Sequence, residues 1–257
     1  IAQGQVAPLS ALLVADTWSA GAGPGGDPAT HAASVLTDLL EERGIEVAGA
    51  PSSGVAPSDA AVLTEVDSLT VAEIVDEALR FSDNTTVELL VKEMGLQSSG
   101  TGSTEAGLTA MREWLAASGL PADGVVLDDG SGLSEENRVT CALLTGLLED
   151  DGADGVIAAG LARPGEPGTL DDKLLAEDLR GRVRAKTGTL RPVTALSGWL
   201  RTVPERDLGF SFIINRPDGQ VTEADGALQQ DLLTAMLTYP QTPDPAQLAP
   251  LAAAPPG

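Results

Sequence analysis

The stretch GRVRAKTGTL, residues 181–190, alternates strictly between two kinds of side chain. A period of two residues is typical of a β-strand, which places alternate side chains on opposite faces of a sheet. One face would carry Arg182, Arg184 and Lys186, and the other Val183, Ala185 and Thr187. Two further apolar stretches follow at residues 193–202 and 208–215, and a short polar turn comes after each of them, at 204–206 and 216–219. The sequence therefore predicts a three-stranded antiparallel meander.

The rest of the chain is mostly helical in pattern. Thr70 with Glu73, and Thr85 with Glu88, have the spacing of capping boxes at the starts of two helices, the second ending at Gly95. Further helices are expected at residues 30–43, 104–118, 137–148 and 222–237, with Asn137 as the cap of the third of these, and short strands at 9–15 and 45–47. Helices followed by adjacent strands indicate an α/β (α+β) fold, an antiparallel sheet packed with helices.

Composition narrows the classes of function. The 257 residues carry a net charge of −23, which disfavours nucleic acid as a partner. No apolar run reaches the roughly 18 residues that a membrane span needs. The single cysteine, Cys141, excludes an internal disulfide, and no His, Cys or Asp cluster has the spacing of a metal site. We therefore expect neither a metal nor another cofactor.

Two short sequence motifs contain side chains that could take part in catalysis. The first is Ser82-Asp83-Asn84, within FSDNTTVELLVKEMG at residues 81–95, in the tight connection between two predicted helices. The second is Lys186-Thr187-Gly188, in the predicted strand. The Ser82 hydroxyl could shuttle a proton, and the Asn84 amide can both donate and accept. Lys186 offers a fixed positive charge for a substrate carboxylate.

The residues around Lys186 suit the binding of a substrate. The hydroxyls of Thr187 and Thr189 could bind the same carboxylate, and the Thr189 N–H could donate to a developing oxyanion. Gly188 would permit close approach of the substrate. Both strings belong to a three-part set of active-site serine enzymes, S-x-x-K, S-x-N and K-T-G.

The S-x-x-K string, which carries the nucleophile, is absent. The chain has three lysines, Lys92, Lys173 and Lys186, and the residues three positions before them are Leu89, Leu170 and Val183. None of these can act as a nucleophile. We therefore expect this chain to hold substrate and relay protons without attacking it, and to be inactive alone.

The chain resembles the C-terminal part of the serine D-alanyl-D-alanine carboxypeptidase/endopeptidase family, peptidase family S13, of the penicillin-binding protein 4 type. The resemblance rests on GRVRAKTGTL, on LDDGSGLSEENRVT at 127–140, on TALSGWL at 194–200 and on FSFIIN at 210–215, and it extends from about Leu9 to Tyr239. It implies catalytic roles for Ser82, Asn84 and Lys186 and substrate-binding roles for Thr187, Gly188 and Thr189. It also implies a penicillin-binding transpeptidase/β-lactamase-like domain that is incomplete on its N-terminal side.

The family implies a function for the parent protein. It would cleave D-Ala from peptidoglycan stem peptides through an acyl-enzyme, would be acylated by β-lactams, and would work outside the cytoplasmic membrane. Residues 1–240 would form the C-terminal part of that domain, and residues 241–257, rich in proline and alanine, would form a disordered tail. The family usually has an arginine at the position of Glu135. The reversed charge could alter stem-peptide preference, and Arg191 could compensate.

Other interpretations remain open at this level. The chain could be a non-catalytic module that binds D-alanyl peptides or a protein, or it could be a β-lactamase-like hydrolase, although class A enzymes would show their nucleophile before Ser82. The arginines near Lys186 could form an anion-binding wall or pair with nearby carboxylates. Asp128 and Asp129 fit a turn better than a metal site.

Overall fold

The computed structural model describes residues 5–10, 12–14, 26–217 and 219–241. They form two compact units, and the chain passes from one to the other after Ile74, after Ser82 and after Val139. The helical unit comprises the described residues of Ile1–Ile74 and Asp83–Val139, and the sheet unit those of Val75–Ser82 and Thr140–Gly257. The mixed helix and antiparallel-sheet architecture confirms the predicted fold class.

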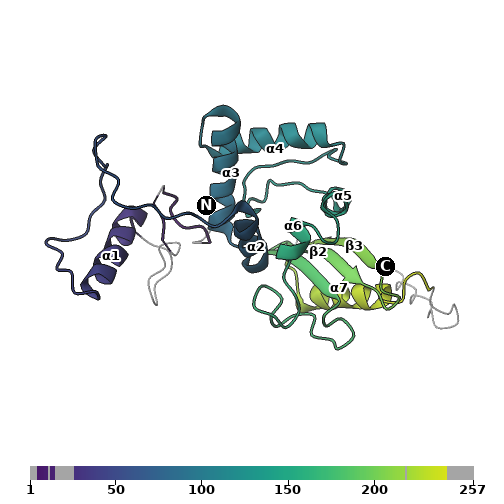
Figure 1. Cartoon of the computed structure of the whole chain (residues 1–257). Coiled ribbons are helices and arrows are strands. Elements are labelled where there is room, and N and C mark those ends of the chain that lie inside the picture. The colour runs from purple at the N-terminus through teal and green to yellow at the C-terminus, as the bar shows by residue number, and fades with distance from the viewer. Residues whose placement is uncertain (1–4, 11, 15–25, 218, 242–257) are drawn as a thin grey trace. The chain divides into compact units, whose positions relative to one another are not determined.

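The sheet unit contains the predicted meander (Figure 1). Its strands are β1 (Val183–Leu190), β2 (Val193–Arg201) and β3 (Asp207–Asn215), in the order β1-β2-β3 and all antiparallel. Lys186 lies opposite Ser197 in β2, and Ser197 lies opposite Ser211 in β3. The predicted bounds of β2 and β3 are confirmed to within one residue.

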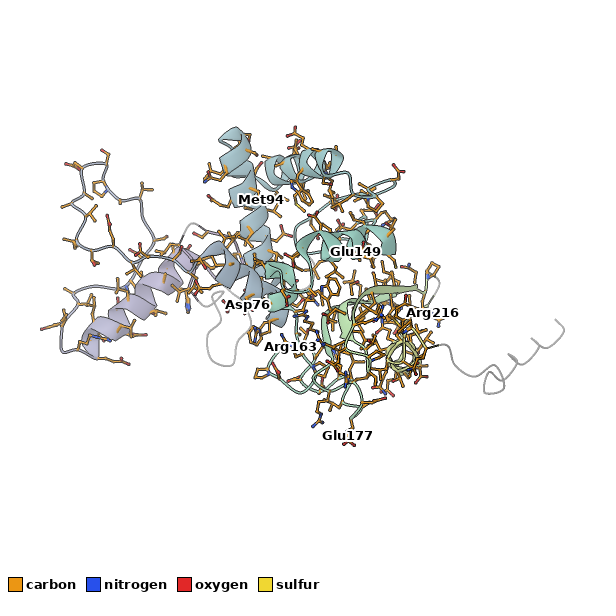
Figure 2. The ribbon with its side chains drawn as sticks, turned by 45° about the vertical axis from the view of Figure 1, so that its right-hand side comes forward. Asp76, Met94, Glu149, Arg163, Glu177 and Arg216 are labelled. Atoms are coloured by element: carbon orange, nitrogen blue, oxygen red, sulfur yellow. The ribbon has the colours of Figure 1, made fainter. Side chains whose placement is uncertain are left out.

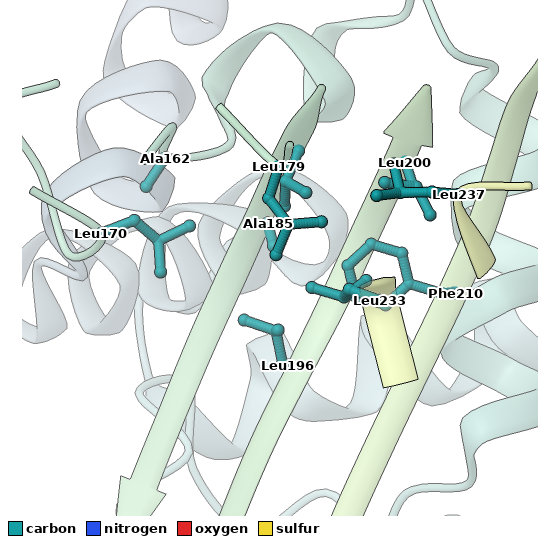
Figure 3. Packing of buried hydrophobic residues seen from close by; sticks show 10 residues of the cluster. Ala162, Leu170, Leu179, Ala185, Leu196, Leu200, Phe210, Leu233 and Leu237 are labelled. Carbon is teal, nitrogen blue, oxygen red and sulfur yellow. The ribbon is translucent and has the colours of Figure 1, made fainter. Parts of the chain in front are cut away.

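Helices cover both faces of this sheet. Helix α7 (Glu223–Met236) packs Leu233 against Leu196, Leu200 and Phe210, and Leu237 just beyond the helix joins the same core (Figure 3). The opposite face packs Trp199 against Leu148 of α5 (Cys141–Asp151) and Ala158 of α6 (Val156–Gly160). The buried face of β1 carries Val183 and Ala185, as the alternation predicts. Lys186 is thereby directed to the face that α5 and α6 cover.

The helical unit contains α1 (Pro28–Glu41), α3 (Asn84–Ser99) and α4 (Thr104–Ser118). Helix α2 (Val71–Phe81) begins in this unit and continues into the sheet unit. Helices α3 and α4 approach closely because Gly107 presents no side chain to Val91. A Cβ at Gly107 would overlap the Val91 carbonyl oxygen and approach its Cγ1 to 2.6 Å. Gly95 lies buried within α3 rather than at its end, and Gly100 is the C-cap.

Some predicted details are wrong. Asp27 caps α1, which therefore begins before the predicted start at residue 30, and Thr140, not Asn137, caps α5. Both differences arise because a neighbouring oxygen reaches the free N–H groups of the first turn. Residues 45–47 are not a strand, since no partner strand pairs with them. The described residues within 9–14 are not in a strand either, and the expected tail at 242–257 lies outside the described residues.

The Thr70–Glu73 capping box is confirmed. The Thr70 backbone N–H donates to Glu73 Oε2 at 2.8 Å, and the Glu73 N–H donates to Thr70 Oγ1 at 3.3 Å. The hydrogen bond from the Thr70 hydroxyl lowers the pKa of Glu73. The second predicted box is wrong. Asp83 caps α3 instead, accepting from the Thr86 N–H at 3.0 Å.

Candidate active site

Ser82 connects α2 and α3 in an unusual backbone conformation. Its φ of 58° lies in the left-handed region, which non-glycine residues adopt only where the surroundings hold them. Asp83, the next residue, caps α3 through both its oxygens, accepting from the Thr86 N–H and, at 2.6 Å, from the Thr86 hydroxyl. The connection is therefore short, as the sequence predicts, and Ser82 is half-buried at its first position.

Ser82 and Lys186 meet within the sheet unit. Lys186 Nζ donates to Ser82 Oγ at 2.7 Å, although the two residues are 104 positions apart in the chain. It also donates to the carbonyl oxygen of Thr187 at 2.8 Å. Burial without a carboxylate partner lowers the pKa of Lys186 from 10.5 to about 8. The pair thus joins a hydroxyl to an amine that can change protonation near physiological pH.

The free edge of β1 continues beyond Lys186. The Ala185 N–H donates away from β2, to the carbonyl oxygen of Ala162 at 2.9 Å. Because backbone N–H groups alternate along a strand, those of Thr187 and Thr189 point to the same side as that of Ala185. In the described part of the chain no acceptor pairs with either. This edge can therefore accept an extended peptide or an oxyanion.

Gly188 and Thr189 are exposed, and Thr187 is half-buried. A Cβ at Gly188 would meet only Ala195 Cβ, at an ordinary 3.7 Å. The fold of this chain therefore does not itself require glycine at that position. The open space at Gly188 lies on the same face of the sheet as Lys186.

Asn84 begins α3 in the helical unit. Its Nδ2 donates to the carbonyl oxygen of Gln5 at 3.3 Å. The structure thus brings Ser82 and Lys186 together, and it describes Asn84 in its own unit with a backbone partner.

The string DDGSGLS at 128–134 is a hydrogen-bonded loop in the helical unit. Asp129 accepts from the backbone N–H groups of Gly132 and Ser134, each at 2.7 Å. Glu88 Oε1 accepts from the N–H groups of Gly130 and Ser131 at 3.0 and 2.8 Å. This agrees with turn formation by the two aspartates. Among the described residues no group of His, Cys, Asp or Glu is arranged to hold a metal ion.

The arginines of β1 have separate partners. Arg182 Nη1 pairs with Glu205 at 3.3 Å and donates to the Thr202 carbonyl oxygen at 3.0 Å, which confirms pairing with a carboxylate. Arg184 donates instead to the carbonyl oxygen of Ala153. Burial, with the nearby charge of Arg163, lowers the pKa of Arg184.

Sequence reasoning missed the roles of several residues, two in the sheet unit and one in the helical unit. Ser197 and Ser211 lie in register with Lys186 on the same face of the sheet, and their hydroxyl oxygens are 2.9 Å apart. Their positions in the period-two pattern of β2 and β3 could have revealed them. The carboxylate of Glu88, which was assigned to a capping box, gives no such signal because its partners lie 42 and 43 residues away.

Comparison with known proteins identifies the family to which this chain belongs. The family model described as the D-Ala-D-Ala carboxypeptidase 3 (S13) family matches residues 25–237. The chain belongs to this family, which confirms the resemblance seen in its motifs.

Individual relatives extend the comparison. A D-alanyl-D-alanine carboxypeptidase of Actinomadura sp. (strain R39) is 33% identical over 255 residues, covering 94% of this chain and 45% of that protein. A carboxypeptidase of Mycobacterium tuberculosis is 29% identical over 202 residues, covering 74% of this chain and 44% of that protein. The chain therefore spans less than half the length of these two curated relatives.

Solved structures support the fold. Penicillin binding protein 4 (dacB) of Haemophilus influenzae matches with a TM-score of 0.67 at 22% identity, over 84% of this chain and 51% of that one. A predatory endopeptidase of Bdellovibrio bacteriovorus matches with a TM-score of 0.51 at 17% identity, over 85% and 59%. The described helices include none that is both long enough and apolar enough to span a bilayer.

Proposed function

We propose that this chain is the substrate-holding and proton-relaying part of a serine-type D-Ala-D-Ala carboxypeptidase/endopeptidase that acts on peptidoglycan stem peptides. The attacking serine and its lysine would come from an S-x-x-K segment outside this sequence. The observation that carries the proposal is the hydrogen bond of 2.7 Å between Lys186 and Ser82, two residues of different family motifs. Family membership supports the reaction class.

Each residue has a role in this reaction. The attacking serine oxygen forms a bond to the carbonyl carbon of the penultimate D-Ala, and the C–N bond to the terminal D-Ala breaks. The proton of the attacking hydroxyl must reach the leaving amine. The Ser82 hydroxyl passes it on, since Ser82 Oγ already accepts a hydrogen bond from Lys186. Water then hydrolyses the ester and releases the shortened peptide.

The strand edge would bind the substrate. The terminal carboxylate lies near Lys186 and the hydroxyls of Thr187 and Thr189, where an anion also favours the protonated amine. The Thr189 N–H, on the free edge of β1, donates to the oxyanion. Asn84 donates its amide to a substrate carbonyl once the substrate replaces Gln5 as its acceptor. Gly188 leaves room for the peptide backbone.

The cellular setting follows from the substrate. Peptidoglycan lies outside the cytoplasmic membrane, so the enzyme would work there, and β-lactams would acylate it because they mimic D-Ala-D-Ala. One H. influenzae relative was crystallised with a β-lactam. Glu135 is exposed, and a Glu135→Arg variant of the longer protein should change the preference among stem peptides.

The test uses a longer protein that includes the S-x-x-K segment. D-Ala release from a D-Ala-D-Ala peptide is measured for the parent protein, for Lys186→Arg and for Lys173→Arg. Lys186→Arg should lower kcat/KM by about 100-fold or more, because the larger guanidinium does not fit the contact with Ser82. Lys173 is exposed and serves as the matched control, with no change expected. If Lys186→Arg and Lys173→Arg release D-Ala with equal kcat/KM, Lys186 has no role in the reaction.

A further inference from the structure

A segment outside both motifs contacts the two elements that carry Ser82 and Lys186. This segment, residues 160–169, is here named the α2 clamp, and it belongs to the sheet unit, as do Ser82 and Lys186. Figure 2 labels Asp76 on α2 and Arg163 in the clamp. Neither family motif includes any residue of the clamp.

One end of the clamp is attached to β1. The Ala162 carbonyl oxygen accepts from the N–H of Ala185, the residue directly before Lys186, at 2.9 Å. Ala162 is almost fully buried in the core that Leu170 and Leu200 share. A shift of this end would therefore move the backbone that carries Lys186.

The other end holds the last turn of α2. The Thr169 N–H donates to the carbonyl oxygen of Arg80, two residues before Ser82, at 3.1 Å. Gly168, at a φ of 145°, lies so close to Arg80 that an added Cβ would be 3.0 Å from the Arg80 carbonyl oxygen. Leu170, which follows, is buried in the core and fixes this end as well.

A third contact lies one turn earlier on the same helix. Gly160 is buried against α2, and an added Cβ would be 2.8 Å from Asp76 Cα. Because that neighbour is backbone, the helix itself would have to move. Pro164 and Pro167 restrict φ at two positions within the clamp.

We propose that the α2 clamp sets the separation between Ser82 and Lys186, and that Gly160 and Gly168 are its positioning residues. Ser82 keeps its left-handed conformation because the residues just before it are held from outside α2. In the enzyme of the proposed function, the clamp would thus fix the proton relay. The role in the proton relay rests on the proposed function, whereas the role in setting the Ser82–Lys186 separation does not.

The test measures the Ser82–Lys186 contact itself. Competitive labelling of lysine amines over a pH series, followed by peptide mass spectrometry, gives the pH of half-maximal reactivity for Lys186. The variants are Gly168→Ala and Gly160→Ala, each of which pushes on α2. The matched control is Gly165→Ala in the same segment, at a φ of 76°, whose added Cβ would meet only Leu175 at 3.9 Å. Exposed Lys173 is the internal reference.

Opening the contact admits water and favours the charged amine, so the half-reactivity pH of Lys186 should rise from about 8. We expect a rise of about one pH unit in Gly168→Ala and Gly160→Ala, with Gly165→Ala and Lys173 unchanged. No rise in either variant, or an equal rise in Gly165→Ala, would overturn the proposal. Loss of cooperative melting in both variants would also overturn it, because the clamp would then be a requirement for folding.

The outcome is independent of turnover. A rise in the half-reactivity pH together with unchanged D-Ala release in the longer protein would uphold the clamp and contradict the proposed function. An unchanged half-reactivity pH together with the expected loss of activity in Lys186→Arg would contradict the clamp and uphold the proposed function.

Discussion

Each of the two units is stabilised internally by a different kind of interaction. In the sheet unit, apolar layers on both faces of β1-β2-β3 bury side chains such as Leu200 and Leu233 completely. In the helical unit, α3 and α4 meet at Gly107, and the 128–134 loop is held by the carboxylates of Glu88 and Asp129. A core of apolar side chains tolerates local change better than the contacts of Gly107 and Glu88 do, because a tight glycine contact and a buried, hydrogen-bonded carboxylate have few substitutes.

The largest expected effect is at Gly107. Its replacement by alanine forces α3 and α4 apart, since the Cβ overlaps the Val91 carbonyl, and should lower the free energy of unfolding by about 3 kcal/mol or more. Gly226, a helical glycine of the sheet unit, has nothing within 4 Å of an added Cβ. Gly226→Ala should therefore stabilise by about 0.5–1 kcal/mol. Urea unfolding measures the change in unfolding free energy for both variants. Equal changes in Gly107→Ala and Gly226→Ala would contradict the difference between the two units.

The next effect concerns the carboxylate that holds the loop. Glu88→Ala leaves the N–H groups of Gly130 and Ser131 without a partner and should cost about 2–3 kcal/mol. Glu88→Gln should cost about 1 kcal/mol, because both N–H groups donate to the same oxygen, Oε1, which glutamine keeps. Glu93→Ala, exposed on the same helix, is the control and should change the unfolding free energy by less than about 0.5 kcal/mol. If Glu88→Ala and Glu88→Gln lower the unfolding free energy equally, the hydrogen bonds of Glu88 Oε1 do not hold the 128–134 loop.

The smallest effect depends on pH and belongs to the sheet unit. The pKa of Lys186 is about 8 in the folded chain and 10.5 as an ordinary value, so the unfolded state binds more protons between these limits. Stability due to this group therefore rises with pH from about 8 to about 10.5. The difference in unfolding free energy between the parent chain and Lys186→Met should change over that window by on the order of 2 kcal/mol, allowing for partial exposure. Lys173→Met should show no such window.

The sheet and its site were the more predictable parts. Alternation in GRVRAKTGTL is a local pattern, and it correctly placed Lys186 opposite the buried face of β1. The position of Ser82 in a short connection followed from the helical patterns on either side. The hydrogen bond between Ser82 and Lys186 could be anticipated only through the family resemblance, since no local pattern relates residues so far apart.

The helical unit was less predictable because its contacts are long-range and polar. Glu88 has the spacing of a cap residue, but Asp83 is better placed to accept from the first turn of α3, which leaves Glu88 for the loop. Gly95 looks like a helix end, yet its lack of a side chain serves the approach of α4. The same applies to Gly160 and Gly168 in the sheet unit, whose partner α2 lies far away in the sequence.

The central claim is that Ser82 relays protons and does not attack. The most direct measurement is labelling with a fluorescent penicillin, followed by mass mapping of the acylated peptide, for this chain alone and for the longer protein. The account predicts that the label lies on the serine of the S-x-x-K segment in the longer protein and that this chain alone takes up none. Acylation of Ser82 in this chain alone would contradict the account, because Ser82 and Lys186 would then form the nucleophile and its base.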